Sequence, residues 1–182
     1  MGIMDWLFGG NKPENQRAVS DVQVLVLGDH GAGKRSIIHY YKDGCFVENS
    51  YGHTDKSVRC IKNSGNGETH VTFVFDESPD SVAPIFSHKK RDYAIILIVV
   101  DLSKDSFSDD VEKYKLYSAK HHSDASILTV GSKMDLLGDK SADIDRDVCL
   151  TSAKTGEGLD TFSELLDGVI AQSNERVQLR KT

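Results

Sequence analysis

Short apolar runs separated by polar residues are the dominant pattern of the chain. Residues 22–27 and 93–100 are apolar almost throughout, which is typical of parallel strands that are buried on both faces of a sheet. Residues 127–130 and 148–150 are shorter runs of the same kind. The pattern therefore predicts buried strands that are spread along most of the chain.

One pair of predicted strands has a different pattern. Residues 57–62 alternate between apolar and polar side chains, as a half-exposed strand does, and residues 70–75 form the predicted return strand. Between them, residues 64–67 read Ser-Gly-Asn-Gly, which is a strong hairpin signal. We therefore expect one antiparallel pair in an otherwise parallel sheet.

Helical spacing of apolar side chains separates the strands. It begins at Ser36, recurs over residues 107–120 and is clearest over residues 159–170. Strands that alternate with helices predict an α/β fold, in which helices cover both faces of a mostly parallel sheet. Ligands of such sheets bind at the carboxyl ends of the strands.

Composition narrows the classes of protein to consider. The chain has 182 residues, of which 38% are hydrophobic and 27% charged, enough for one domain with a core. Its net charge of −6 argues against general nucleic-acid binding, which usually requires a basic surface. The three cysteines lie far apart and fit neither a metal site nor a disulfide framework. We therefore expect a reducing, cytoplasmic location.

The ends of the chain differ from its centre. We predict an apolar segment and linker over residues 1–20, one domain over residues 21–173 and a polar tail over residues 174–182. A helix over residues 1–8 would carry Ile3, Met4, Leu7 and Phe8 on one face. That face suits a peripheral contact with a membrane surface or a partner. The alternative is a tail that packs on the domain or stays disordered.

Residues 28–34 read Gly-Asp-His-Gly-Ala-Gly-Lys and fit the pattern G-x-x-x-x-G-K of a phosphate-binding loop. The loop follows a predicted strand and precedes a predicted helix, so backbone N–H groups would converge on phosphate oxygens. The alternative is a glycine-rich turn with an ordinary surface lysine. The candidate phosphate-binding residues are Asp29, His30, Gly31, Ala32, Gly33, Lys34, Arg35 and Ser36.

Arg35 departs from this pattern. It stands where a Ser or Thr hydroxyl would bind Mg²⁺. An arginine has no acceptor atom and cannot ligate a cation, so we expect a weakened magnesium site. One hypothesis is that the guanidinium contacts a phosphate and partly replaces the metal.

Two further motifs follow in order. Residues 132–135 read Ser-Lys-Met-Asp and residues 151–154 read Thr-Ser-Ala-Lys, each directly after a predicted strand. With the phosphate loop, they resemble the motifs of Ras-like small GTPases, the Rab branch in particular, over about residues 21–173. The resemblance implies a P-loop NTPase of the G-domain type, three layers thick, with one antiparallel strand in a six-stranded sheet.

The resemblance implies a site for GTP or GDP. Asp135 offers a carboxylate that can accept from two donors on one edge of guanine. Adenine lacks both donors, and an unpaired buried carboxylate is costly. The alternatives are a solvated loop carboxylate for Asp135 and a core position for Phe46, which stands where the family places an aromatic against the base. The other candidates for the guanine site are Ser132, Lys133, Ser152, Ala153 and Lys154.

The metal and hydrolytic positions match the family less well. Asp76 and Thr54 are the candidate metal ligands, although Thr54 could equally be an ordinary loop residue. Pro79 replaces the glycine whose N–H contacts the γ-phosphate, and proline has no N–H. Asp80 stands where many relatives carry the glutamine that orients water. We therefore assign no catalytic residue and expect at most a slow GTPase.

Three further expectations come from the resemblance. Residues 136–151 leave little room for the helix that relatives have before the last strand, so we expect it to be reduced or missing. Effector or regulator proteins would bind residues 45–57 and 76–92. The tail at residues 177–182 has no cysteine, so no prenyl anchor is expected.

Three functions stay open. The first is a guanine-nucleotide-binding regulator of traffic or signalling with weak or absent hydrolysis, which we favour. The second is a pseudo-GTPase, which uses the fold as a scaffold for protein interactions without nucleotide cycling. The third is an ATP-directed enzyme, against which Asp135 and residues 151–154 argue.

Overall fold

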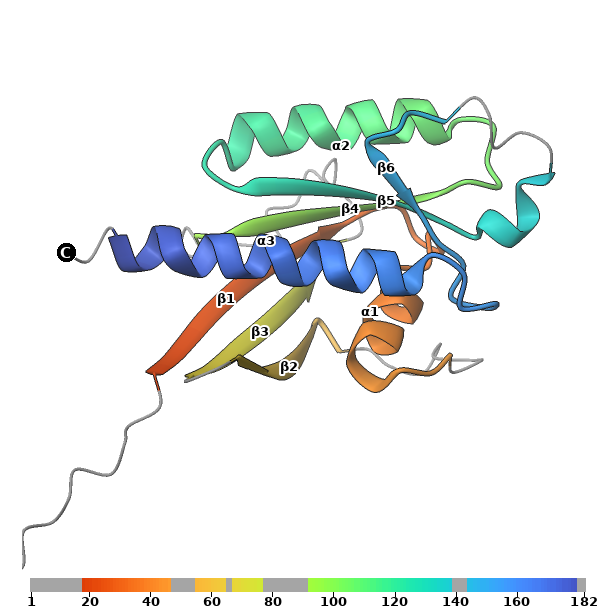
Figure 1. The fold of residues 1–182 in the computed structure, drawn as a ribbon. Coiled ribbons are helices and arrows are strands. Elements are labelled where there is room, and N and C mark those ends of the chain that lie inside the picture. Colours follow the sequence, from red (N-terminus) through yellow and green to blue (C-terminus); the bar gives the residue numbers. More distant parts are fainter. Residues whose placement is uncertain (1–17, 47–54, 65–66, 77–91, 139–143, 180–182) are drawn as a thin grey trace, which may run out of the picture.

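A computed structural model describes residues 18–46, 55–64, 67–76, 92–138 and 144–179 (Figure 1). The strands are β1 (Ala18–Leu27), β2 (Ser57–Ser64), β3 (Gly67–Phe75), β4 (Ile95–Asp101), β5 (Ser126–Ser132) and β6 (Val148–Leu150). The helices are α1 (Lys34–Asp43), α2 (Phe107–His121) and α3 (Leu159–Leu179), and η2 (Met134–Leu136) is a 3-10 turn.

The strands form one mixed sheet in the order β2-β3-β1-β4-β5-β6. All neighbouring strands are parallel except β2 and β3, in which Ser64 pairs with Gly67 across the predicted hairpin. The predicted α/β class with one antiparallel strand is therefore confirmed. β1 and α3 extend beyond the predicted bounds 21–173 of the central domain.

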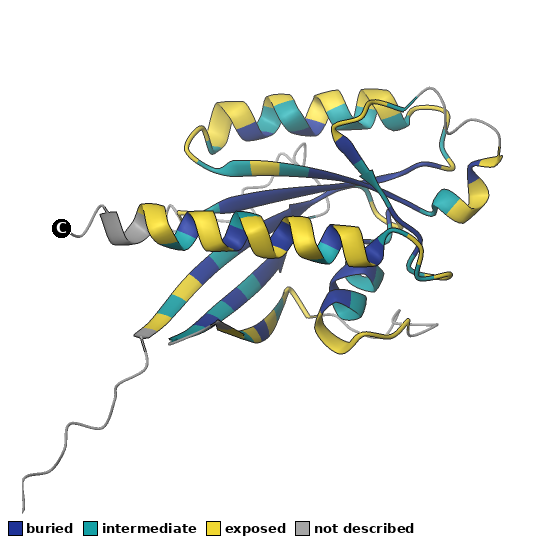
Figure 2. Cartoon of the chain, viewed as in Figure 1, coloured by how far each residue is buried: buried dark blue, intermediate teal, exposed yellow. Residues whose placement is uncertain are grey.

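The sheet has a hydrophobic core on each face. α1 and α3 cover one face and α2 covers the other, as Figure 1 shows. Figure 2 shows the central strands buried and the outer faces of the helices exposed. Every residue of β4 is buried, as its continuous apolar run predicts. The three layers are thus held by burial of apolar area, about 1.5–3 kcal/mol for each large side chain.

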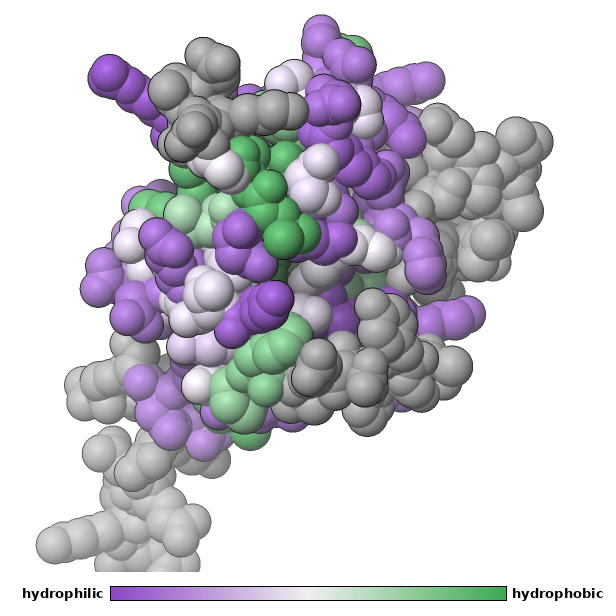
Figure 3. Space-filling model, turned by 90° about the vertical axis from the view of Figure 1, so that its right-hand side faces the viewer, coloured by the Kyte–Doolittle hydropathy of each residue, from purple (hydrophilic) through white to green (hydrophobic). Residues whose placement is uncertain are grey.

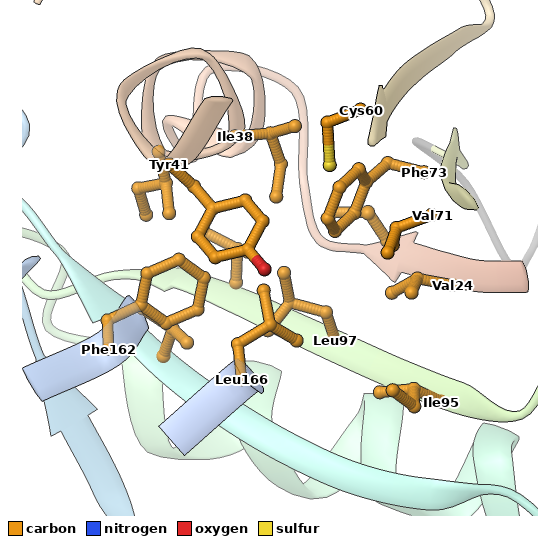
Figure 4. Close-up of a cluster of buried hydrophobic side chains, with 14 of the residues drawn as sticks. Val24, Ile38, Tyr41, Cys60, Val71, Phe73, Ile95, Leu97, Phe162 and Leu166 are labelled. Carbon is orange, nitrogen blue, oxygen red and sulfur yellow. The ribbon is translucent and has the colours of Figure 1, made fainter. Parts of the chain in front are cut away.

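Aromatic rings join α1 and α3 to the sheet in the larger core. The ring of Tyr41 meets the edges of Phe73 and Phe162 at centroid distances of 5.8 and 6.0 Å. Figure 4 shows these rings around Leu166 and Leu97. This contact sets the position of α1, and with it the loop that precedes the helix.

The chain leaves β1 at a point where the sheet order reverses, because β1 lies between β3 and β4. Such a switch point is where α/β sheets bind ligands. Between β5 and β6, the described residues form η2, a further 3-10 position at Gly138, turns and irregular chain, and no α-helix. The expectation that the helix before the last strand is reduced or missing is therefore confirmed for the residues that the structure describes. None of the described helices is both long enough and apolar enough to cross a membrane.

Candidate functional site

The glycine-rich loop begins against the backbone of β4. Gly28 directly follows β1 and has a φ of +148°. A Cβ on Gly28 would lie 2.2 Å from the carbonyl oxygen of Val99. Only glycine fits this close approach, so the start of the loop is fixed by its contact with β4.

The end of the loop forms the N-terminus of α1. Gly33 is the N-cap, with a φ of +83°, and makes no side-chain cap. Lys34 is 4% exposed, and its Nζ donates to the carbonyl oxygens of Gly28 and Asp29, both at 2.7 Å. His30 and Gly31 are exposed and Ala32 is buried. The loop thus gathers a helix N-terminus and an ammonium group, which together favour an anion.

Asp29 has partners that the motif did not predict. Lys104 Nζ donates to its Oδ2 at 2.9 Å, and the Tyr114 hydroxyl donates to its Oδ1 at 2.7 Å. The Lys104 hydrogen bond is the main cause that lowers the pKa of Asp29. The carboxylate therefore joins the loop to α2, and any phosphate contact of Asp29 would come from its backbone.

Burial and the bond to Asp29 raise the pKa of Tyr114, which keeps its hydroxyl protonated as the donor. Lys104 lies three residues after the end of β4 and Tyr114 is a buried side chain of α2. Helical spacing identifies Tyr114 as a core residue. The pairing of Asp29 with both residues depends on the packing of α2 and has no local signal in the sequence.

Lys133 begins the loop after β5 in a conformation that is rare for a residue with a side chain, with a φ of +61°. Its Nζ donates to Asp101 Oδ2 at 2.5 Å. Ser103 donates from both its N–H and its Oγ to Oδ1 of the same carboxylate. Burial raises the pKa of Asp101, but these hydrogen bonds outweigh it and the net shift is downward. Asp101 was not among the predicted site residues.

The loops after β5 and β6 are bonded to each other. Ser152 Oγ donates to Asp135 Oδ1 at 2.6 Å, and the Met134 N–H donates to the Thr151 carbonyl at 3.0 Å. Ser132 Oγ donates to the Ala32 carbonyl at 2.7 Å, which connects these loops to the glycine-rich loop. The structure therefore brings together three segments that the motifs identified separately.

The loop after β6 is also shaped by a glycine. The Ser152 N–H donates to the Glu157 carbonyl at 2.9 Å. A Cβ on Gly158, at φ +73°, would lie 2.0 Å from the Leu150 carbonyl oxygen. This turn leaves Ala153 half-buried and Lys154 exposed beside Ser152.

Figure 3 views the end of the molecule at which α1, η2 and the loop after β6 lie in Figure 1. The surface is mostly hydrophilic, with apolar side chains gathered in two places. Phe46 is 40% exposed after the end of α1 and Leu136 is 59% exposed in η2. Phe46 is thus not a core residue.

The candidate metal positions are only partly described. Thr54 lies outside the described residues. Asp76 follows β3, is half-buried and donates its N–H to the Val26 carbonyl at 2.9 Å. Ser36 is half-buried in the first turn of α1.

Arg35 lies in the same first turn of α1. Its Nη2 lies 3.5 Å from the Asp55 carbonyl oxygen and its Cζ lies 5.1 Å from the centroid of the Phe75 ring. Position 35 therefore supplies N–H donors where a metal would need an oxygen ligand. The side chain at this position does not fit the magnesium site that the family motif implies.

The chain was compared with known proteins. A family model described as the Ras family matches residues 23–166. Among curated proteins, the chain is 27% identical over 122 residues to the Ras-related protein Rab-12 of human and mouse, which covers 65% of this chain and 50% of that protein. It is 28% identical over 129 residues to the human Rho-related GTP-binding protein RhoD, which covers 68% of this chain and 59% of that protein.

The chain spans about half the length of the curated relatives it matches. The family match covers most of the chain, from within β1 to the first turns of α3, and includes all three motif segments. The sheet order and the positions of the loops agree with the sequence match. The chain therefore belongs to the Ras family.

Proposed function

We propose that the protein is a guanine-nucleotide-binding regulator of traffic or signalling, with weak or absent intrinsic GTP hydrolysis. The observation that carries this proposal is the hydrogen bond from Ser152 to Asp135, which orients the carboxylate between the loops after β5 and β6. A carboxylate can accept about four hydrogen bonds. The bond from Ser152 therefore leaves capacity for the two donors on the guanine edge.

Selection of guanine over adenine would come from the same carboxylate. Asp135 is exposed in the structure, and a bound base would cover it. An acceptor that is covered without its donors costs about 1–3 kcal/mol, or roughly 5- to 150-fold in affinity. Lys133 supports this role because the hydrogen bond from its Nζ to Asp101 holds the end of its side chain in place. Ala153, Lys154 and Phe46 would complete the base site, as the resemblance to the family implies.

Phosphate binding would rest on the glycine-rich loop and the first turn of α1. The glycine N-cap and the Lys34 ammonium support it, since backbone N–H groups at a helix N-terminus and a positive charge both favour phosphate oxygens. Ser132 supports the shape of this loop through its bond to Ala32.

Weak hydrolysis follows from side chains rather than from the fold. Pro79 and Asp80 replace the glycine and glutamine that support the γ-phosphate and water in relatives, and both lie outside the described residues. Without these groups, charge that develops in the transition state is less well stabilised. We propose effector contacts through residues 45–57 and 76–92, and a cytoplasmic location with peripheral membrane contact through residues 1–8.

One observation favours a second candidate, a pseudo-GTPase scaffold. Polar side chains of the candidate site already have partners within the protein: Lys34 bonds the loop carbonyls, Lys133 bonds Asp101, and Asp135 accepts from Ser152. Only Lys34 is buried among the three, and it is paired, so the absence of a ligand leaves none of them buried without a partner. A domain of this kind could fold and bind partners with no nucleotide at all.

Equilibrium titration with fluorescent GDP, GTP and ATP analogues separates the candidates, and single-turnover phosphate release measures hydrolysis. We expect GDP and GTP to bind more tightly than ATP by roughly 5- to 150-fold, with very slow phosphate release. Equal binding of ATP would contradict the guanine site. A folded protein that bound none of the three would establish the scaffold, and rapid phosphate release would contradict weak hydrolysis.

A further inference from the structure

Arg35 lies where the family motif has a hydroxyl that binds Mg²⁺. Its guanidinium contacts the Asp55 carbonyl and the Phe75 ring. We propose that the Arg35 guanidinium takes the place of the divalent cation, so that this chain binds guanine nucleotide without Mg²⁺. This inference rests on the proposed function and adds the identity of the positive group beside the phosphates.

The position of the guanidinium is the first step. Arg35 follows Lys34 in the first turn of α1, so both cations leave the same end of the glycine-rich loop. The guanidinium lies between the carbonyl of Asp55 and the ring of Phe75. Asp55 follows Thr54 and Phe75 precedes Asp76. The guanidinium thus contacts two residues that are adjacent in sequence to the other predicted metal ligands, Thr54 and Asp76.

The chemistry of the group is the second step. Mg²⁺ requires about six oxygen ligands at short distances, whereas arginine brings N–H donors and a fixed positive charge. A cation at this position would repel a second cation. The same group suits phosphate, because its planar donors can bond two oxygens at once and its charge persists at any physiological pH.

The contact with Phe75 is the third step. The Arg35 guanidinium lies over the Phe75 ring, and such cation–π contacts are attractive and limit the movement of the side chain. A pre-oriented donor loses less freedom when it binds an anion. Replacement of a dication by a single positive charge also leaves less charge to stabilise a hydrolytic transition state, in agreement with weak hydrolysis.

The test is the metal dependence of nucleotide release from the full chain. The protein is loaded with a fluorescent N-methylanthraniloyl GDP, unlabelled GDP is added in excess, and the release rate is measured with MgCl₂ and with excess EDTA. We expect the two rates of the natural sequence to differ by less than about twofold. Arg35→Ser, which restores a hydroxyl, should make EDTA accelerate release by about 5- to 150-fold, the usual range of coupling between two ligands.

Arg176→Ser is the matched control, because Arg176 lies on α3 and contacts Ser126 at the amino end of β5. It should behave as the natural sequence does. A second readout uses phosphorus NMR of bound GDP with Mn²⁺ added. Paramagnetic broadening of the β-phosphate signal is expected for Arg35→Ser and not for the natural sequence.

Each result decides between the two claims. Strong acceleration by EDTA in the natural sequence, or broadening by Mn²⁺, would overturn the inference and leave the proposed function standing. Metal-independent release from both the natural sequence and Arg35→Ser would show that Arg35 is not the cause, and would overturn it as well. A natural protein that binds no guanine nucleotide would overturn the proposed function and the inference together.

Arg35→Lys covers the case in which Arg35→Ser does not fold. Lysine keeps the charge but lacks the planar donors, so we expect faster GDP release that stays independent of Mg²⁺. Release at the natural rate would contradict a role for the guanidinium beyond its charge.

Discussion

The two sides of the candidate site preserve different parts of the Ras pattern. On the base side, Asp135 and Ser152 match the family and are bonded to each other, and Lys133 is held by Asp101. On the metal side, Arg35 replaces a hydroxyl and lies between Asp55 and Phe75. Recognition of a base and support of a metal use separate side chains, so one can change while the other stays.

The backbone between the two sides supports the contrast. Ser132 on the base side bonds Ala32 of the glycine-rich loop, and Lys34 bonds the start of the same loop. These hydrogen bonds stabilise the glycine-rich loop, which both sides share. Among the described residues of the metal side, the departure from the family motif is the side chain of Arg35.

The largest expected effect tests the shared loop. Gly28→Ala would place a Cβ 2.2 Å from the Val99 carbonyl oxygen at a strained φ. We expect the free energy of unfolding in urea to fall by at least about 3 kcal/mol. Gly44→Ala is the control, since it has a φ of +70° and its Cβ would meet no described atom within 4 Å; it should cost about 1 kcal/mol. Equal losses would mean that the contact with β4 does not fix the loop.

The next effect concerns the base side. Asp135→Ala removes the acceptor for the guanine donors, and we expect GDP affinity to fall by roughly 5- to 150-fold while ATP affinity stays nearly unchanged. Fluorescence titration measures both. Asp124→Ala removes an exposed carboxylate from the turn before β5 and should change neither value. Unchanged GDP affinity in Asp135→Ala would place the base elsewhere.

A smaller effect tests the contact between the loop and α2. Tyr114→Phe removes the hydrogen bond to Asp29 and keeps the buried ring. We expect the free energy of unfolding to fall by about 0.5–1.5 kcal/mol. Tyr117→Phe removes a hydroxyl from the same helix and should cost less. A loss in Tyr114→Phe no larger than that in Tyr117→Phe would refute a role for this bond.

The smallest effect is a pH dependence. The Lys104 hydrogen bond lowers the pKa of Asp29 below its ordinary value of 3.8. A carboxyl group with a lowered folded-state pKa stabilises the fold above its unfolded-state pKa and loses that contribution as the pH falls through the folded-state value. Lys104→Met should therefore flatten the loss of stability below pH 3.8, by less than about 1 kcal/mol because the pair is partly exposed.

Urea unfolding of the natural sequence and of Lys104→Met, at neutral and at acid pH, measures this difference in stability. Lys120→Met, which removes an exposed charge from the end of α2, is the control and should leave the loss of stability at acid pH as it is in the natural sequence. If Lys104→Met loses as much free energy of unfolding at acid pH as the natural sequence does, the ion pair with Asp29 does not contribute to stability in solution.

The strand pattern predicted the sheet well because buried parallel strands carry a local signal. The runs that became β4 and β6 and the turn at Gly67 are visible in a few neighbouring residues. The motif loops were likewise predictable, since their spacing is local. Their convergence followed from the rule that ligand loops gather at the carboxyl ends of strands.

Contacts between distant elements could not be predicted in this way. The bonds from Lys104 and Tyr114 to Asp29 depend on how α2 packs over the sheet, and the sequence around Asp29 contains no trace of them. The same holds for the rare backbone conformation of Lys133, which tertiary contacts impose on an ordinary residue. Arg35 was visible as a departure from the motif, but its place beside Phe75 was not.

The most direct test of the central claim is the identity of the nucleotide that the purified protein carries. The protein is denatured by heat, and the released nucleotide is identified and counted by ion-exchange chromatography. Nearly one GTP or GDP for each chain is the predicted result, and GTP in particular would agree with weak hydrolysis. A folded protein that releases no guanine nucleotide and takes up neither added GDP nor added GTP would contradict the account.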